Sequence, residues 1–429
     1  MRGPRLVLRA LVIALFLLGR GLLWLVGWLA LLLTFTGRER RRLWFGECLL
    51  GLFRDLGATF IKLGQIMSTR PDLFPPHVIR ALEKLQDQVG PFPAAEVVRT
   101  IGEDFGAPPE ALFESFDKEP IASASVAQVH RARLPGGRVV AVKVRRPKIE
   151  SLVDFDLSVM RAAARALALI PSVKLLAPVE TVGEFGRGIR TQIDFTIEAE
   201  HNRRFRACFA GEPDVIFPAL VPELCSKRVL TMDFIEGTKI LVVARSHTAH
   251  DPTRLARLGF RVLLKMIFED GFVHADLHPG NILVTPDGKV ALLDLGLVGV
   301  LDDVHRQAFA RYFAAWAAGD GRTMAHLMAD LSPSPGSIPD REGFTRDVEA
   351  FTKRYLGKPL GDLQVGAVVF DMLQILRRHR VRVNATFTMV NIAIAVTEGI
   401  GKQLDPTLDL LHEALPFFAK LRAQEARAP

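Results

Sequence analysis

Three oxygen-bearing side chains within one short stretch are spaced for phosphoryl transfer. Residues 274–296 read HADLHPGNILVTPDGKVALLDLG, in which Asp276 is followed by Asn281 and then by Asp294. In such a site the first Asp accepts a proton from the attacking group, and the Asn and second Asp hold Mg²⁺. Amide and carboxylate oxygens are the hard ligands that this cation prefers. We therefore predict Asp276 as the catalytic residue, and Asn281 and Asp294 as metal ligands.

A cationic side chain upstream suits the phosphates of ATP. Lys143 lies in VVAVKV, an apolar run that predicts a strand, where a lysine can reach the α- and β-phosphates. Glu198 follows on a predicted helix, and we expect its carboxylate to orient the lysine. His274 and His278 lack the helical HExxH spacing of a zinc protease, so that class is excluded. The predicted cofactors are ATP and Mg²⁺.

The segment expected to cover the phosphates is rich in alanine and contains no glycine. It reads PIASASVAQVH, and the predicted nucleotide-binding residues in it are Ala122, Ser123, Ala124, Ser125, Val126, Ala127 and Gln128. Alanine restricts the backbone more than glycine, so we expect a stiff loop. Beyond Gly296 a helix is expected by about Asp302, which leaves no room for the long segment on which protein kinases lay a peptide. A peptide substrate is therefore disfavoured.

The remaining pattern predicts the elements that position these residues. The predicted elements are helices over 43–115 with breaks near Pro71, Pro75 and Gly90, a β-hairpin over 120–145, helices over 151–170 and 184–210, a strand over 227–237, a helix over 253–270, two short strands around Pro286, and helices from Asp302 onward. Strands followed mostly by helices favour an α+β fold with two lobes and a cleft between them.

Most of the positive charge lies at the N-terminus. Eight arginines and one glutamate fall within residues 1–42, which accounts for nearly all of the net charge of +8. The arginines flank an apolar run from Ala10 to Thr36, which as a helix would extend about 40 Å, longer than a hydrocarbon core of about 30 Å. No cleavage site for a signal peptide follows it. We predict a membrane anchor, as one tilted span or a shallow hairpin, with a cytoplasmic body at the inner membrane.

Two other classes of site are disfavoured. The folded body behind the anchor is nearly neutral, which argues against a nucleic-acid groove. The three cysteines, Cys48, Cys208 and Cys225, form no CxxC pair, so we expect neither a disulfide framework nor a zinc site.

These motifs resemble the UbiB family, also called the ADCK or aarF-type family, of atypical kinase-like proteins linked to ubiquinone biosynthesis. The similar segments are FIKLGQIMSTRPDLFP at 60–75, LQDQVGPF at 85–92, PIASASVAQVH and HADLHPGN. The resemblance implies a bilobal protein-kinase-like fold with a helical KxGQ extension over the cleft, in which Lys62 and Gln65 close the nucleotide site. It also implies a bilayer, a quinone-precursor lipid and quinone-biosynthesis enzymes as partners.

The sequence departs from the family pattern at two site positions. The ExD element reads Gln192-Ile193-Asp194, so the predicted partner of Lys62 is neutral and the closure is expected to be looser. Gly90 replaces the first proline of the family's VPP element, which softens that turn.

We predict four parts: an anchor over 1–42, the KxGQ extension over 43–118, a kinase-like N-lobe over 119–237 and a helical C-lobe over 238–429. The predicted function is a membrane-associated kinase or ATPase that supports isoprenoid quinone biosynthesis, acting on or extracting a lipid-like precursor. Two alternatives stay open. One is a phosphotransferase of the choline or aminoglycoside kinase type, and the other is a pseudokinase scaffold gated by nucleotide.

Overall fold

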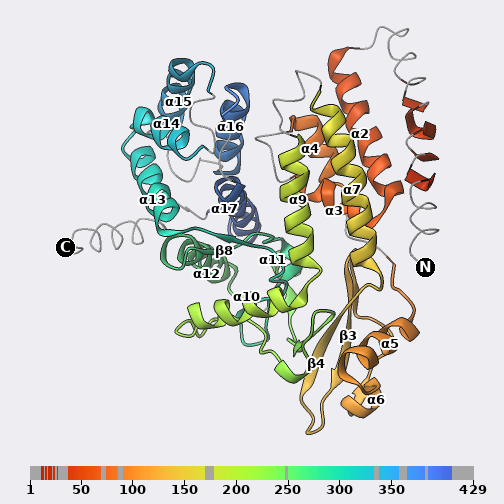
Figure 1. The fold of residues 1–429 in the computed structure, drawn as a ribbon. Helices are drawn as coiled ribbons and strands as arrows, with labels where there is room; N and C mark the ends of the chain where they lie inside the picture. The colour runs from red at the N-terminus through yellow and green to blue at the C-terminus, as the bar shows by residue number, and fades with distance from the viewer. Residues whose placement is uncertain are drawn as a thin grey trace. The chain divides into compact units, whose positions relative to one another are not determined.

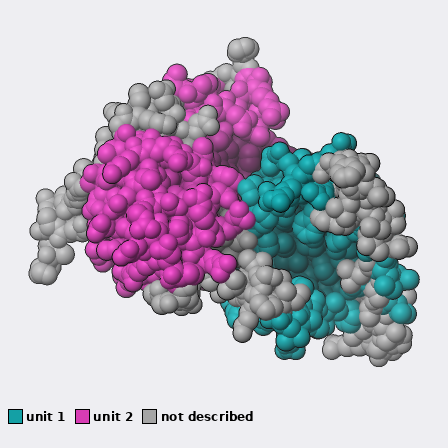
Figure 2. Space-filling model, turned by 90° about the horizontal axis from the view of Figure 1, so that it is seen from above, with its two compact units in different colours: residues 1–196, 221–233 teal, residues 197–220, 234–429 magenta. Residues whose placement is uncertain are grey.

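The structure is a computed structural model of the chain, which divides into two units (Figure 2). Unit 1 comprises Met1–Thr196 and Val221–Asp233, and unit 2 comprises Ile197–Leu220 and Phe234–Pro429. The residues that the structure describes are 11–13, 15–16, 18–21, 23–24, 27, 37–68, 74–85, 90–169, 178–246, 250–332, 338–356, 365–381 and 385–407.

Unit 1 contains two groups of helices and one antiparallel sheet (Figure 1). Its helices are α2 (Arg38–Leu56), α3 (Ala58–Ser68), α4 (Pro76–Leu82), α5 (Ala94–Phe105), α6 (Pro109–Leu112), α7 (Ile149–Leu167), α9 (Pro178–Gln192) and the 3-10 turn η1 (Pro222–Leu224). Helices α7 and α9 run side by side, and α3 contacts both of them. The predicted helices over 43–115 are therefore confirmed for the described residues, with breaks before α4 and α5; Pro71 lies outside the described residues.

The sheet of unit 1 presents Lys143 on one face. Its strands are β1 (Ser115–Phe116), β2 (Ala122–Ser123), β3 (Ala127–Arg133), β4 (Val139–Arg145) and β6 (Val229–Asp233), in the order β1-β3-β4-β6 with β2 also paired to β3. Val140, Val142 and Val144 are fully buried in a core that also contains residues of α5. Because side chains alternate along a strand, Lys143 and Arg145 lie on the opposite face of β4. The predicted hairpin is confirmed, and its turn places Gly136 and Gly137 at φ of 95° and 89°.

Unit 2 begins within α10 (Phe195–Cys208) and holds two small sheets and the C-terminal helices. Its strands are β5 (Val215–Ile216), β7 (Thr238–Lys239), β8 (Phe272–His274), β9 (Ile282–Val284), β10 (Val290–Leu292) and β11 (Val298–Val300). The sheet orders are β5-β10-β9-β7 and β11-β8. The helical elements are α11 (Ile240–Arg245), α12 (Pro252–Leu264), η2 (Lys265–Glu269), η3 (Pro279–Asn281), α13 (Asp303–Ala317), α14 (Gly321–Asp330), α15 (Arg341–Tyr355), α16 (Val365–Arg378) and α17 (Ala385–Leu404).

Two predicted helices are divided in the structure. The helix expected over 184–210 is instead α9 and α10, separated at Ile193 and Asp194. Asp194 accepts a hydrogen bond from the backbone N–H of Thr196 at 3.2 Å, so its carboxylate caps the new helix. The helix expected over 253–270 is α12 followed by a π-helical turn at 265–269. The first break arises from local capping that the apolar periodicity does not record, whereas the helical backbone continues from α12 into the π-helical turn.

No helix among the described residues is long and apolar enough to cross a membrane. Much of the apolar run from Ala10 to Thr36 lies outside the described residues. The predicted anchor therefore stays a prediction.

Candidate active site

The loop that carries Asp276 is built around a buried histidine in unit 2. His274 ends β8, is completely buried, and accepts a hydrogen bond on Nδ1 from the backbone N–H of Asp276 at 3.1 Å. Burial lowers the pKa of the His274 imidazole, although the charges of Asp276 and Asp294 oppose that shift. A neutral ring can accept this hydrogen bond, so His274 supports the loop through the backbone of Asp276. The Asp276 carboxylate has no hydrogen-bond partner among the described residues.

The two predicted metal ligands meet at the open end of one hairpin. Asn281 immediately precedes β9, Asp294 follows β10, and the backbone N–H of Leu293 donates to the carbonyl of Asn281 at 3.0 Å. The Asn281 side-chain amide donates to the carbonyl of Asp276 at 3.3 Å, which leaves its own oxygen for another contact. One oxygen of the Asp294 carboxylate accepts the backbone N–H of Gly296 at 3.0 Å. The structure therefore brings Asp276, Asn281 and Asp294 together as the spacing predicted.

A strand pairing connects this hairpin to the Asp276 loop. His274 in β8 pairs with Val298 in β11, and the backbone N–H of Ala275 donates to the carbonyl of Leu297 at 3.0 Å. Helix α13 begins at Asp303, where the side chain of Asp302 caps it by accepting the backbone N–H of His305 at 2.8 Å. The short segment expected after Gly296 is therefore confirmed.

Helix α10, which carries Glu198, is attached to the same loops of unit 2. One turn after Glu198, His201 donates a hydrogen bond to the carbonyl of Leu295 at 2.8 Å, which ties the helix to the segment carrying Asp294. Glu198 is buried, with 3% of its surface exposed, whereas Glu200 is exposed. Of these two glutamates, the predicted one is therefore the one with a buried carboxylate.

Lys143 belongs to unit 1, where its ammonium lies over an aromatic ring. The Nζ atom lies 5.3 Å from the centroid of Phe195, within the range of a cation–π contact. Phe195 is fully buried, and its backbone N–H donates to the carbonyl of Lys227 at 3.2 Å. Lys143 and Glu198 belong to different units, so their ion pair stays a prediction.

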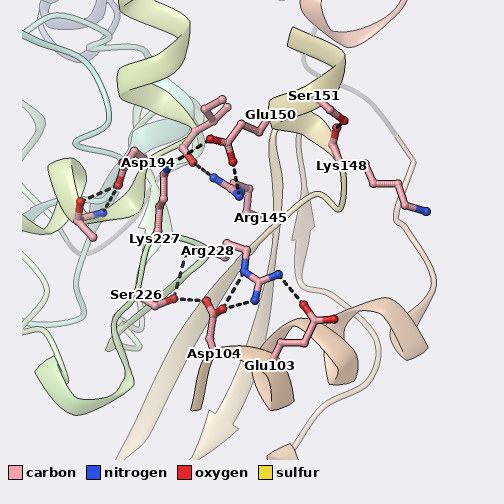
Figure 3. Close-up of polar contacts among 12 residues, drawn as sticks. Glu103, Asp104, Arg145, Lys148, Glu150, Ser151, Asp194, Ser226, Lys227 and Arg228 are labelled. Carbon is pink, nitrogen blue, oxygen red and sulfur yellow. Dashed lines mark hydrogen bonds and ion pairs between the residues drawn. The ribbon is translucent and has the colours of Figure 1, made fainter. Parts of the chain in front are cut away.

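An ion network fixes the segment that carries Phe195 (Figure 3). The buried guanidinium of Arg145, on the same face of β4 as Lys143, donates to the carbonyl of Ile193 at 2.7 Å. Glu150 accepts hydrogen bonds from Arg145 at 3.2 Å and from Lys227 at 3.1 Å. These contacts connect the end of β4 and the start of α7 to the α9–α10 junction, which carries the ring beside Lys143.

Within the alanine-rich loop, Gln128 serves as an internal brace. Its side chain has 1% of its surface exposed, accepts the backbone N–H of Phe92 at 2.9 Å and donates to the Phe92 carbonyl at 3.3 Å. Ser125 is also fully buried, and its hydroxyl lacks a partner among the described residues. Direct nucleotide contacts by residues 122–128 stay a prediction.

The KxGQ segment forms α3, packed against the rest of unit 1. Gln65 donates to the carbonyl of Leu85 at 3.2 Å. A Cβ atom at Gly64 would overlap the side chains of Leu85 and Phe53, which explains why glycine is needed there. Lys62 is half-buried on this helix, and α3 contacts α9, which ends at Gln192. The predicted closure by Lys62 and Gln65 is untested.

The donor set suits Mg²⁺ better than a metal with a complete protein cage. Among the described residues, no three histidine, cysteine, aspartate or glutamate side chains gather as a metal site. Mg²⁺ usually takes one or two protein carboxylates and completes its shell with water and substrate phosphates. One carboxylate and one amide oxygen at the end of the β9–β10 hairpin fit that pattern.

Comparison with protein-family models decides the family. The model of the ABC1 atypical kinase-like domain matches residues 84–328, and that of the UbiB helical domain matches residues 348–409. The chain belongs to the UbiB family of ABC1 atypical kinase-like proteins. Its fold is accordingly an α+β kinase-like fold, and the match at 348–409 begins within α15 and extends past α17.

Individual relatives agree with this assignment. "Probable protein kinase UbiB" of Vibrio cholerae strain M66-2 is 34% identical over 387 residues, which cover 89% of this chain and 71% of the relative. The protein of the same name from strain ATCC 39315 matches to the same extent. The solved complex of Rv3197 with erythromycin from Mycobacterium tuberculosis has a TM-score of 0.56, 24% identity, and coverage of 83% of this chain and 92% of that one. That likeness supports the fold alone.

The motifs predicted the charged residues of the candidate site and did not indicate the residues that position them. Phe195 and Arg145 escaped notice because their roles depend on contacts between elements far apart in the chain. One signal was present for Phe195, since it directly follows the Gln192-Ile193-Asp194 element.

Proposed function

We propose that this protein is a membrane-associated atypical kinase or ATPase that binds Mg-ATP and supports isoprenoid quinone biosynthesis. The observation that carries the proposal is the convergence of Asp276, Asn281 and Asp294 on paired elements of unit 2. Membership of the UbiB family, whose curated relative is named a probable protein kinase, supports phosphoryl transfer as the chemistry. The same relationship supports a role in ubiquinone biosynthesis.

Each predicted site residue has a separate role in the proposed reaction. Asn281 and Asp294 would hold Mg²⁺, which neutralises charge on the nucleotide phosphates. Lys143 would bind the α- and β-phosphates, with Glu198 orienting its ammonium and residues 122–128 covering the nucleotide. Asp276 would accept the proton of the attacking hydroxyl or water. Because phosphoryl transfer depends mainly on positioning and charge, the rigid supports of these side chains matter as much as their basicity.

A lipid-like substrate suits the chain better than a peptide. The segment between Gly296 and α13 contains only β11, which leaves little room for a peptide platform. At the start of α2, Arg38, Arg41 and Arg42 line a hollow of about 400 Å³ with Phe45 and His77, a cationic surface suited to an anionic bilayer. This surface directly follows the apolar run of the sequence. We therefore propose a polyprenylated quinone precursor as the molecule that is phosphorylated or extracted.

The proposed activity is tested by Asp276→Asn. Loss of a general base costs about 10²-fold to 10⁴-fold in rate, so ATP turnover should fall by that factor while Mg-ATP affinity is retained. Turnover is measured with vesicles that contain a polyprenylated phenol, with empty vesicles, and with a hydrophilic alcohol as the competing acceptor.

Two results would contradict this proposal. Turnover only with the hydrophilic alcohol indicates a small-molecule phosphotransferase. Full biological function of Asp276→Asn, together with loss of function in Lys143→Ala, indicates a nucleotide-gated scaffold.

A further inference from the structure

The alanine-rich loop of unit 1 is tightly bent although it contains no glycine. Ala122 and Ser123 pair with Val129 and Gln128, and the backbone N–H of Ala124 donates to the carbonyl of Ala127 at 2.8 Å. These bonds fix the two ends of the turn. They leave the peptide groups at its tip, around Ser125, without strand partners.

One arginine contacts the carbonyls of that tip. Arg146 donates from Nε to the carbonyl of Ser125 at 3.2 Å and from Nη2 to that of Ala124 at 3.0 Å. Its own backbone N–H donates to the carbonyl of Val126 at 2.8 Å. Three consecutive carbonyls of the loop therefore point toward a single residue, which directly follows β4 and lies three positions after Lys143.

The same guanidinium also holds the neighbouring segment at 90–92. It donates to the carbonyl of Gly90 at 2.9 Å and lies 5.2 Å from the ring centroid of Phe92. From the other side, Gln128 bonds to both backbone groups of Phe92, at 2.9 and 3.3 Å. The loop is thus attached to the segment 90–92 at two points, through Arg146 at its tip and through Gln128 at its C-terminal end.

The direction of the carbonyls determines the direction of the adjoining N–H groups. All peptide bonds of the described residues are trans, so each N–H points away from the carbonyl of the preceding residue. With the carbonyls of Ala124 and Ser125 turned toward Arg146, the N–H groups of Ser125 and Val126 point the opposite way. Neither N–H has a hydrogen-bond partner among the described residues. Two successive unpaired N–H groups are a recurrent binding site for anions such as phosphate.

We propose that Arg146 is a positioning residue, which orients the Ser125 and Val126 N–H groups toward a nucleotide phosphate before the nucleotide arrives. This inference rests on the proposed function. If the loop is already ordered, binding does not have to supply the free energy of ordering it, and affinity rises. In a glycine-rich loop that ordering would accompany each binding event. Here the arginine and the alanines hold the loop in one conformation before the nucleotide binds.

The experiment compares Arg146→Gln and Arg146→Lys with Arg133→Gln. Arg133 is a matched control because it also donates to a carbonyl, that of Gly137 at 2.8 Å, at the far end of the same hairpin. Amide hydrogen exchange of residues 121–127 is measured without nucleotide, and Mg-ATP affinity and turnover are measured for the full chain. For Arg146→Gln we expect faster exchange in that loop and about tenfold weaker Mg-ATP binding, with turnover at saturating ATP unchanged. Lysine lacks the planar fork and should restore the affinity only in part.

Each other outcome overturns the inference in a recognisable way. Wild-type affinity in Arg146→Gln refutes it while the proposed function stands. Faster exchange throughout unit 1, with equal losses in affinity and turnover, assigns Arg146 a general structural role. Absence of Mg-ATP binding in the wild type refutes the proposed function itself, and the phosphate role of Arg146 with it. In that case the exchange of residues 121–127 still shows whether Arg146 orders the loop.

Discussion

At the scale of single residues, the site depends on buried supports beside its charged groups. His274 holds the Asp276 loop through a neutral ring, and Arg145 holds the carbonyl of Ile193 beside Phe195. Charged side chains in such a site act through fixed geometry, because misplaced charges stabilise a transition state poorly.

Glu150 gives a pH-dependent test of the support network (Figure 3). Its hydrogen bond from Lys227, followed by the charges of Lys227 and Arg145, holds the pKa of this carboxyl below its ordinary value of 4.5. A lowered folded-state pKa stabilises the protein above pH 4.5 and loses that effect as the pH falls through the lowered value. Because the Glu150 side chain is 48% exposed, we expect the contribution to stay below about 1 kcal/mol.

The measurement is urea unfolding at about pH 7 and about pH 4. Glu150→Gln should destabilise the protein at the higher pH, and the difference from wild type should shrink at the lower pH. The control is Glu110→Gln, because Glu110 is exposed and has no hydrogen bond or ion pair among the described residues. An equal difference at both pH values would contradict the assigned role of the Glu150 charge.

The sequence predicted the charged residues of the proposed site and left out the residues that position them. Asp276, Asn281 and Asp294 were found because their spacing within one short stretch is constrained by a hairpin and a loop. Arg146 was not found, since its role consists of contacts with Gly90 and Ser125, which are distant in sequence. Side chain-to-backbone contacts of this kind leave no periodic pattern.

At the scale of elements, helix α9 precedes the segment that carries Phe195. The helix contains three glycines. Gly186 is buried against Leu157 of α7, where an added Cβ would lie 3.3 Å from two methyl groups. At Gly188 an added Cβ would meet no described atom within 4 Å. Close packing against Leu157 therefore favours glycine at position 186, whereas no such contact favours glycine at position 188.

Gly188→Ala should stabilise unit 1 because it reduces the backbone freedom lost on folding. The expected gain in free energy of unfolding is about 0.5–1 kcal/mol. Gly186→Ala is the matched control, and it should gain less or destabilise, since the close contact with Leu157 offsets the helix preference. Urea unfolding of both variants measures the difference. Equal gains would show that the packing of α7 on α9 does not distinguish these positions.

The boundaries of elements were predictable where turn residues mark them. The Pro-Gly-Gly turn of the β3–β4 hairpin and the Pro286-Asp287-Gly288 turn were found from composition, and Gly288 does adopt a positive φ of 79°. The break between α9 and α10 was missed because apolar residues continue across it. There, capping by Asp194 outweighs the periodicity of the sequence.

At the scale of the whole molecule, the predicted site draws on both units. Lys143, Lys62 and residues 122–128 belong to unit 1, while Glu198, Asp276, Asn281 and Asp294 belong to unit 2. The proposed function therefore requires that residues of both units bind the same Mg-nucleotide. If the nucleotide bound to one unit alone, its affinity would depend only on the residues of that unit.

The most direct test of the account is calorimetric titration of the full chain with Mg-ATP in Lys143→Met and Asp294→Ala. Each change removes a charged contact to phosphate or metal, so each should weaken binding by at least about tenfold. Lys118→Met and Asp287→Asn are the controls, since Lys118 is an exposed residue of unit 1 and Asp287 lies in the turn of the β9–β10 hairpin. The account predicts losses in both site variants, abolition of the Mg²⁺ dependence in Asp294→Ala, and wild-type binding in both controls. Wild-type affinity in either site variant would contradict it.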